Sequence, residues 1–211
     1  DPVLRLDAMG DQPMGAGDRV GAQFAERIGP RQIAPRADEI DRTNEFPMDL
    51  WRKFSDMGFL GPTIPEQYGG LGVGYLDHVL IIETLTRYSA SVSLSYGAHS
   101  NLLVNNLNMN GTEAQKETWL KPMLEGEICT GFSMTEPMNP GSDPRSITTR
   151  AELDGDEWVI NGHKGFTSNG YAADFYIVMC RTADPDDPGG ANEKMTQIIV
   201  PRETPGVNIL R

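Results

Sequence analysis

The spacing of apolar residues changes once along the chain, at about Gly126, and this change constrains the fold more than any other feature. Before it, apolar side chains recur every three or four positions, as in amphipathic helices. After it, they alternate with polar ones, as in strands. A run of helices followed by a run of strands predicts an α+β multidomain protein, with a boundary near residues 125–128.

We expect three parts along the 211 residues. Residues 1–17 have no clear period and are predicted to be a frayed N-terminus. Residues 18–127 form an all-α helical domain, and residues 128–211 form part of a β-barrel-like domain.

The helical part is divided by proline, glycine and capping signals. An amphipathic helix is expected from Asp18, interrupted at Pro30 and Pro35. A second helix opens at Pro47 and stops at Gly58. Residues 59–74 are a loop, residues 75–110 are two helices broken around residues 88–90, and a capping box at residues 112–115 starts the last helix.

The glycine run at residues 69–74 does not fit a dinucleotide-binding loop. Its spacing fails the G-x-G-x-x-G pattern because the third required position is Tyr75, and no strand precedes it.

The β part contains six expected strands: 129–135, 147–153, 157–161, 164–168, 174–182 and 196–201. Asn161-Gly162 and Asn169-Gly170 are typical of hairpin turns.

Composition excludes several classes of function. A net charge of −12 argues against nucleic acids and anionic membrane surfaces as partners. No apolar run has the length of a membrane span, and the first residues lack the apolar core of a signal peptide. Cys129 and Cys180 lack metal-ligand spacing, so we expect two buried thiols and no metal site.

Two segments of the β part suggest a binding site for a flat ligand with a phosphate tail. In the first, Cys129–Asp143, the strand ends at Glu136-Pro137, which leaves backbone groups of Met134 and Thr135 without a neighbouring strand. The sequence Gly141-Ser142-Asp143 then offers backbone N–H groups and a hydroxyl suited to a phosphate. The second segment, Gly162–Gly170, carries one aromatic ring and two hydroxyl groups.

These segments resemble the flavin-dependent acyl-CoA dehydrogenases. The sequences FSMTEP, GSD and NGHKGFTSNG are similar to the flavin-binding signatures of that family, and SYGAHSNLLVNN at residues 95–106 is most similar to its isovaleryl-CoA dehydrogenase branch. The resemblance covers residues 33–211. It implies FAD as cofactor, a short or branched-chain acyl-CoA as substrate, transfer of electrons to an electron-transferring flavoprotein, and a homotetramer or dimer in the bacterial cytoplasm or the mitochondrial matrix.

The resemblance also assigns individual residues. Those expected to bind the cofactor are Phe132, Met134, Thr135, Gly141, Ser142, Phe166, Thr167 and Ser168. Those expected to bind the substrate are Ser142, Ser95, Tyr96, His99 and Leu103. Glu136 is interpreted as structural, and the catalytic base is expected beyond Arg211, in a third domain, so residues 1–211 alone are expected to be inactive.

Two departures from the family pattern leave alternatives open. Phe166 stands where the family usually has tryptophan, and the linker Met138-Asn139-Pro140 is one residue longer than usual. These departures suggest a non-catalytic binding protein that keeps the fold. A second alternative is an acyl-CoA oxidase, which passes its electrons to oxygen, because no residue of this sequence decides between the two electron acceptors.

Overall fold

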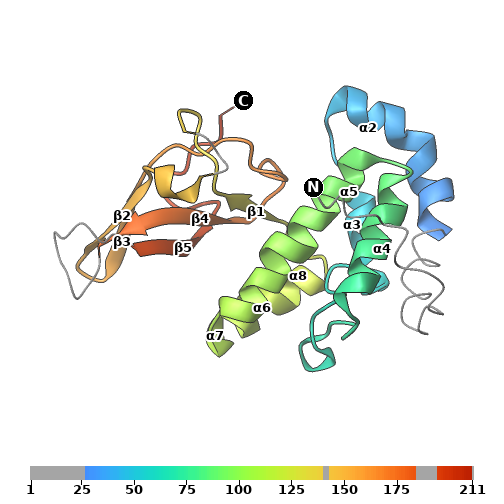
Figure 1. The fold of residues 1–211 in the computed structure, drawn as a ribbon, viewed down its shortest axis with the longest axis horizontal. Coiled ribbons are helices and arrows are strands. Elements are labelled where there is room, and N and C mark those ends of the chain that lie inside the picture. Colours follow the sequence, from blue (N-terminus) through green and yellow to red (C-terminus); the bar gives the residue numbers. More distant parts are fainter. Residues whose placement is uncertain (1–26, 140–142, 184–193, 211) are drawn as a thin grey trace, which may run out of the picture.

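The computed structural model describes residues 27–139, 143–183 and 194–210. Helices come first and strands follow, as the sequence predicts (Figure 1). The predicted frayed terminus and the predicted helix start at Asp18 lie outside the described residues.

The helical part forms two groups along the chain. The first contains η2 (Gly29–Ile33), η3 (Ala34–Arg36), α2 (Ala37–Thr43), α3 (Met48–Asp56) and η4 (Glu66–Tyr68). The second contains α4 (Tyr75–Thr86), α5 (Ala90–Gly97), η5 (Ala98–Asn105), α6 (Asn106–Asn110), α7 (Glu113–Gln115), η6 (Lys116–Leu120) and α8 (Lys121–Leu124).

Local sequence explains most of these boundaries. Pro47 precedes α3 and Gly58 follows it with a φ of +73°, which suits glycine. The Ser89 hydroxyl accepts a hydrogen bond from the Val92 N–H at the start of α5. At α7 the predicted capping box is present, with Thr112 and Gln115 bonded to each other's backbone N–H.

The predicted interruptions at Pro30 and Pro35 are wrong. Helical turns continue from η2 through η3 into α2. Each proline lies at the first or second position of a short helical segment, where a missing N–H costs little, so the helix changes type there without ending.

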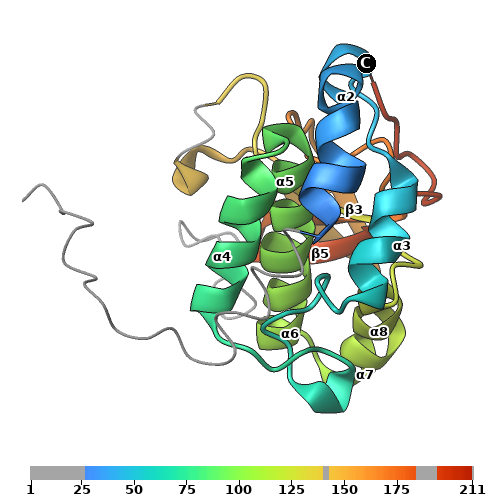
Figure 2. The same cartoon turned by 90° about the vertical axis from the view of Figure 1, so that its right-hand side faces the viewer.

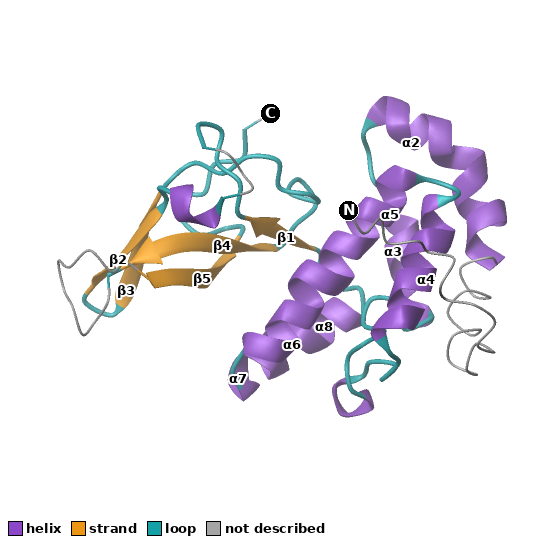
Figure 3. Ribbon diagram, viewed as in Figure 1, coloured by secondary structure: helices purple, strands orange, loops and turns teal. Residues whose placement is uncertain are grey.

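The β part is one five-stranded mixed sheet, in which η7 (Pro144–Ser146) precedes the second strand. The strands are β1 (Thr130–Ser133), β2 (Arg150–Asp154), β3 (Glu157–Asn161), β4 (Phe175–Thr182) and β5 (Lys194–Pro201). β4 is central: it pairs with β1 in parallel, with β5 antiparallel and with β2 at one position, while β3 pairs with β2 (Figure 3).

Two predictions for this part are wrong. Residues 164–168 are not a strand, because the backbone of Phe166 has a φ of +55°, which no strand residue adopts. Asn161-Gly162 is not a hairpin turn either. A Cβ on Gly162 would lie 2.2 Å from the Thr149 hydroxyl, so glycine is needed there for a close approach.

The helical and β parts share a hydrophobic core. The continuous helix made by α5, η5 and α6 lies between the sheet and the other helices, beside β1, in Figure 1, and Figure 2 shows it in front of β5. One cluster of buried residues joins the helices to β4: Ile64, Leu103, Val104, Leu107, Leu120, Met123, Leu124, Phe175 and Ile177. The sheet edge at β1 is therefore held at a fixed place beside η5.

Candidate functional site

The chain just after β1 is fixed by the segment after β3. The Gly165 N–H donates to the Thr135 carbonyl at 2.9 Å, and the Lys164 ammonium donates to the Met134 carbonyl at 3.0 Å. Within the described chain, the N–H groups of Met134 and Thr135 have no hydrogen-bond partner. The sequence predicted free backbone groups here. The carbonyls turn out to be used internally, while the N–H donors have no partner among the described residues.

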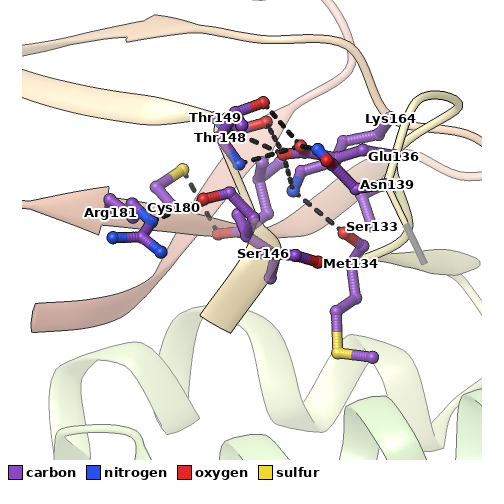
Figure 4. Close-up of polar contacts among 12 residues, drawn as sticks. Ser133, Met134, Glu136, Asn139, Ser146, Thr148, Thr149, Lys164, Cys180 and Arg181 are labelled. Atoms are coloured by element: carbon purple, nitrogen blue, oxygen red, sulfur yellow. Dashed lines mark hydrogen bonds and ion pairs between the residues drawn. The ribbon is translucent and has the colours of Figure 1, made fainter. Parts of the chain in front are cut away.

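Glu136 anchors this arrangement from the buried side (Figure 4). Its carboxylate accepts hydrogen bonds from the N–H and the hydroxyl of both Thr148 and Thr149, at 2.6–2.8 Å. Lys164 donates at 3.0 Å and Asn139 at 2.7 Å. Burial opposes ionisation, but the hydrogen bonds from Thr149 and Thr148 outweigh it and hold the pKa of Glu136 well below its usual range. A carboxylate so engaged is a poor general base.

Phe166 follows Gly165, the residue that bonds to the Thr135 carbonyl, and it is exposed to solvent. Its side chain is 93% exposed and its backbone lies in the left-handed region, where a bulky residue is strained. The neighbouring Thr167 hydroxyl lies 3.1 Å from the Ser133 hydroxyl. The structure therefore brings together the two segments that the sequence singled out.

The remaining predicted cofactor residues lie in different settings. Phe132 packs against the shared core, and Ser168 is half-buried. Gly141 and Ser142 lie outside the described residues, so their contact with a phosphate stays a prediction.

Most of the predicted substrate residues are buried in packing. Tyr96, His99 and Leu103 have 0% exposure, so their side chains do not line an open pocket here. The imidazole of His99 bonds to the Thr130 hydroxyl at 3.0 Å and to the Met123 carbonyl at 3.3 Å. Burial lowers the pKa of His99 to about 4. His99 therefore joins η5 to β1, and we do not carry these three residues into the substrate site.

Ser95 differs from those three residues. It is half-buried, and its carbonyl accepts a hydrogen bond from the Asn169 side chain at 3.0 Å. Of the predicted substrate residues that the structure describes, Ser95 is the one that hydrogen-bonds to the segment Gly162–Gly170.

Sequence reasoning did not name Lys164, Thr148, Thr149 or Asn169 individually as residues that bind a ligand or hold the site together. Lys164 contacts a residue 28 positions away, and Asn169 contacts one 74 positions away. No local pattern marks such partners.

A cavity of about 530 Å³ lies elsewhere, between residues 55–69 and residues 116–125. None of the predicted site residues lines it.

Comparison with known proteins identifies the family. Residues 22–127 match the acyl-CoA dehydrogenase N-terminal domain, and residues 131–211 match the acyl-CoA dehydrogenase middle domain. The chain belongs to the acyl-CoA dehydrogenase family.

Individual relatives agree with this assignment. Isovaleryl-CoA dehydrogenase of Pongo abelii is 46% identical over 82% of this chain and 41% of its own length. Butyryl-CoA dehydrogenase from Megasphaera elsdenii is 32% identical, with a TM-score of 0.82 over 93% of this chain and 51% of the other. Glutaryl-CoA dehydrogenase from Mycobacterium smegmatis, solved in complex with FADH2, is 25% identical, with a TM-score of 0.83 over 92% and 47%. The chain thus spans about half the length of these acyl-CoA dehydrogenases, or less.

Two other features, a membrane-spanning helix and a metal-binding cluster, are absent from the described residues. Within residues 27–139, 143–183 and 194–210, no helix is long and apolar enough to cross a membrane. The same residues contain no cluster of three or more histidine, cysteine or acidic side chains able to hold a metal ion.

Proposed function

We propose that the full-length protein catalyses FAD-dependent α,β-dehydrogenation of a short or branched-chain acyl-CoA and passes the electrons to an electron-transferring flavoprotein. The observation that carries this proposal is the pairing of residues 133–136 with residues 164–167. Within the described chain the N–H groups of Met134 and Thr135 have no hydrogen-bond partner, and Phe166, directly after the paired Gly165, is exposed.

This arrangement fits the edge and face of a flavin. An isoalloxazine ring has carbonyl and nitrogen acceptors along one edge, which the N–H groups of Met134 and Thr135 and the Thr167 hydroxyl would satisfy. Its flat face would pack on the ring of Phe166. This ring is exposed to solvent when no ligand is bound, so the contact would bury apolar surface. FAD, when bound, would supply the acceptor for a hydride from the substrate β-carbon.

The residues of this chain would orient and shield the reactants. The donors of Met134 and Thr135 are fixed through Lys164 and Glu136 before any ligand arrives, so little reorganisation is needed on binding. The α-proton must leave to a separate base. Glu136 is a poor proton acceptor, because its oxygens already accept hydrogen bonds from Thr148, Thr149, Lys164 and Asn139 and its pKa is lowered, so a different carboxylate of the full-length protein would remove the proton.

Several finer statements rest on the relatives. The 46% identical isovaleryl-CoA dehydrogenase, which is mitochondrial, supports a branched short chain as substrate. The location in the mitochondrial matrix or the bacterial cytoplasm rests on the family resemblance. We further propose a homotetramer or dimer of the full-length protein, as the family resemblance implies.

Spectroscopy of the full-length natural polypeptide tests the proposal. Reconstituted with FAD, it should be yellow, and isovaleryl-CoA or butyryl-CoA should bleach the flavin band under anaerobic conditions. A protein that stays colourless, or is not bleached by any acyl-CoA, would contradict the proposed function. Release of peroxide in air at the rate of substrate turnover would show that oxygen, and not a flavoprotein, accepts the electrons.

A further inference from the structure

Asn169 links the loop that carries Phe166 and Thr167 to the helical part of the molecule. Its side-chain N–H donates to the Ser95 carbonyl of α5 at 3.0 Å. This hydrogen bond joins the proposed flavin-facing loop directly to Ser95, which, of the predicted substrate residues that the structure describes, is the half-buried one.

The Ser95 carbonyl can accept this bond because the helix changes type beside it. α5 ends at Gly97 and passes into the π-helical segment η5, whose hydrogen bonds span five residues, not four. The Ala98 N–H is shared between the carbonyls of Leu94 and Ser95. A carbonyl oxygen has two lone pairs, so Ser95 retains capacity for a donor from outside the helix.

The backbone around Asn169 holds its side chain toward the helix. Asn169 has a φ of +62°, a conformation that asparagine tolerates better than most residues. Its carbonyl accepts from the Ala172 N–H at 2.9 Å, and the Gly170 N–H donates to the Thr167 carbonyl at 3.0 Å. These bonds form a compact turn directly after Phe166 and Thr167.

The loop is therefore held at both ends. At one end, Lys164 and Gly165 bond to the carbonyls of Met134 and Thr135 in the β part. At the other end, Asn169 bonds to α5 in the helical part. The second bond sets how far α5 lies from the loop.

We propose that Asn169 is a positioning residue that holds the Ser95 turn of α5 against the flavin-facing loop and thereby sets which acyl chains of the thioester substrate fit between them. This inference rests on the proposed function. A displacement of about 1 Å at a reacting centre can cost about a hundredfold in rate, so one lost hydrogen bond at this junction is enough to alter selectivity.

Two substitutions at Asn169 remove the side-chain N–H donor while keeping the backbone conformation. Asn169→Asp keeps the shape of the side chain and its tolerance of positive φ, but places an acceptor against the Ser95 carbonyl. Asn169→Gly keeps the backbone conformation and removes the side chain. The matched control is Asn44→Asp: Asn44 has a φ of 55° at the end of α2, is exposed, and makes no side-chain hydrogen bond within the described chain.

The experiment compares these variants as full-length, FAD-loaded proteins on butyryl-CoA, isovaleryl-CoA and hexanoyl-CoA. Both Asn169 variants should bind FAD within about twofold of the wild type, raise KM by about tenfold and change the ranking of the three substrates. Hydrogen exchange in residues 94–105 should be about tenfold faster in both variants. Asn44→Asp should match the wild type in every measurement.

The possible outcomes distinguish the positioning role of Asn169 from the proposed dehydrogenase function. Asn169 variants whose exchange, KM values and substrate ranking equal those of Asn44→Asp would overturn the positioning role alone. A uniform loss of kcat on all three substrates together with loss of FAD would also overturn it, because that pattern indicates a general structural role. A wild-type protein that no acyl-CoA bleaches would overturn the proposed function first.

Discussion

The Lys164 ammonium lies 3.0 Å from the Glu136 carboxylate, and these side chains are only 11% and 5% exposed. Lys164 also reaches the Met134 carbonyl at 3.0 Å. The same ammonium therefore compensates a buried charge and fixes the backbone beside the proposed flavin. A substitution at Lys164 should affect both stability and cofactor binding.

Replacing Lys164 by methionine keeps the apolar stem and removes the charge. We expect a loss of about 3 kcal/mol in the free energy of unfolding, because Glu136 stays buried without its cation. We also expect FAD affinity to fall by about tenfold, because the Met134 carbonyl loses its donor. Denaturant titration and fluorescence titration with FAD measure the two effects.

The control for this prediction is Lys116→Met. Lys116 pairs with Glu113 at 2.9 Å and is similarly covered, at 13% exposure, but its partner is 71% exposed. Surface pairs contribute little, so this variant should lose much less stability and keep its FAD affinity. Equal effects of the two substitutions would contradict the role assigned to Lys164.

Acid should destabilise the fold through Glu136. Its pKa is lowered in the folded protein, with an ordinary value near 4.5. The stabilisation is therefore present above pH 4.5 and is lost as the pH falls below it. Thermal melts of wild type and Glu136→Gln from pH 7 to pH 3 should converge toward the acid end. A difference in Tm that stays constant over this range would count against the prediction.

Burial of His78 and His99 should make the stability of the fold depend on pH in a higher range than the burial of Glu136 does. Burial lowers the pKa values of both His78 and His99 from 6.5 to about 4. The unfolded state then binds protons first, so stability is full above pH 6.5 and falls between pH 6.5 and 4. His99→Gln should flatten the dependence of Tm on pH in this window. The exposed His163→Gln serves as the control and should keep the wild-type slope.

Phe166 should show a conflict between stability and function. Its φ of +55° suits glycine, and its ring is 93% exposed, so Phe166→Gly should raise the free energy of unfolding by up to about 1 kcal/mol without FAD.

The same substitution removes the ring surface proposed to cover the flavin, so FAD affinity should fall. Phe166→Trp keeps an aromatic ring and should retain FAD binding without the gain in stability. Calorimetry of the apoprotein and titration with FAD distinguish the two variants. If Phe166→Gly bound FAD as tightly as the wild type, the ring would not belong to the site.

The sequence predicted the order of elements because periodicity and capping are local. The change of period at Gly126, the helix stop at Gly58 and the capping box at Thr112 each depend on neighbours within a few residues. The errors arose where distant contacts outweigh local preference. Gly162 looks like part of a hairpin turn, but its lack of a Cβ is needed for contact with Thr149.

In the candidate site, too, some features could be predicted from the sequence and others depend on tertiary contacts. The sequence predicted a strand that ends at Glu136-Pro137, and β1 ends close by, at Ser133. The two segments that resemble flavin-binding signatures could also be named from their residues. Tyr96 and His99 could not be excluded as pocket residues, because helical spacing alone does not distinguish a buried face from a ligand-facing one. Their 0% exposure depends on how α5 and η5 pack.

The sequence by itself determined the helical and strand regions, the family and the two segments that face the proposed flavin. Only the tertiary structure decided what holds those segments together: the ion pair of Lys164 with Glu136 and the bond from Asn169 to α5. The physical reason is that such side chains find partners many positions away, whose identity depends on the packing of the helices against the sheet.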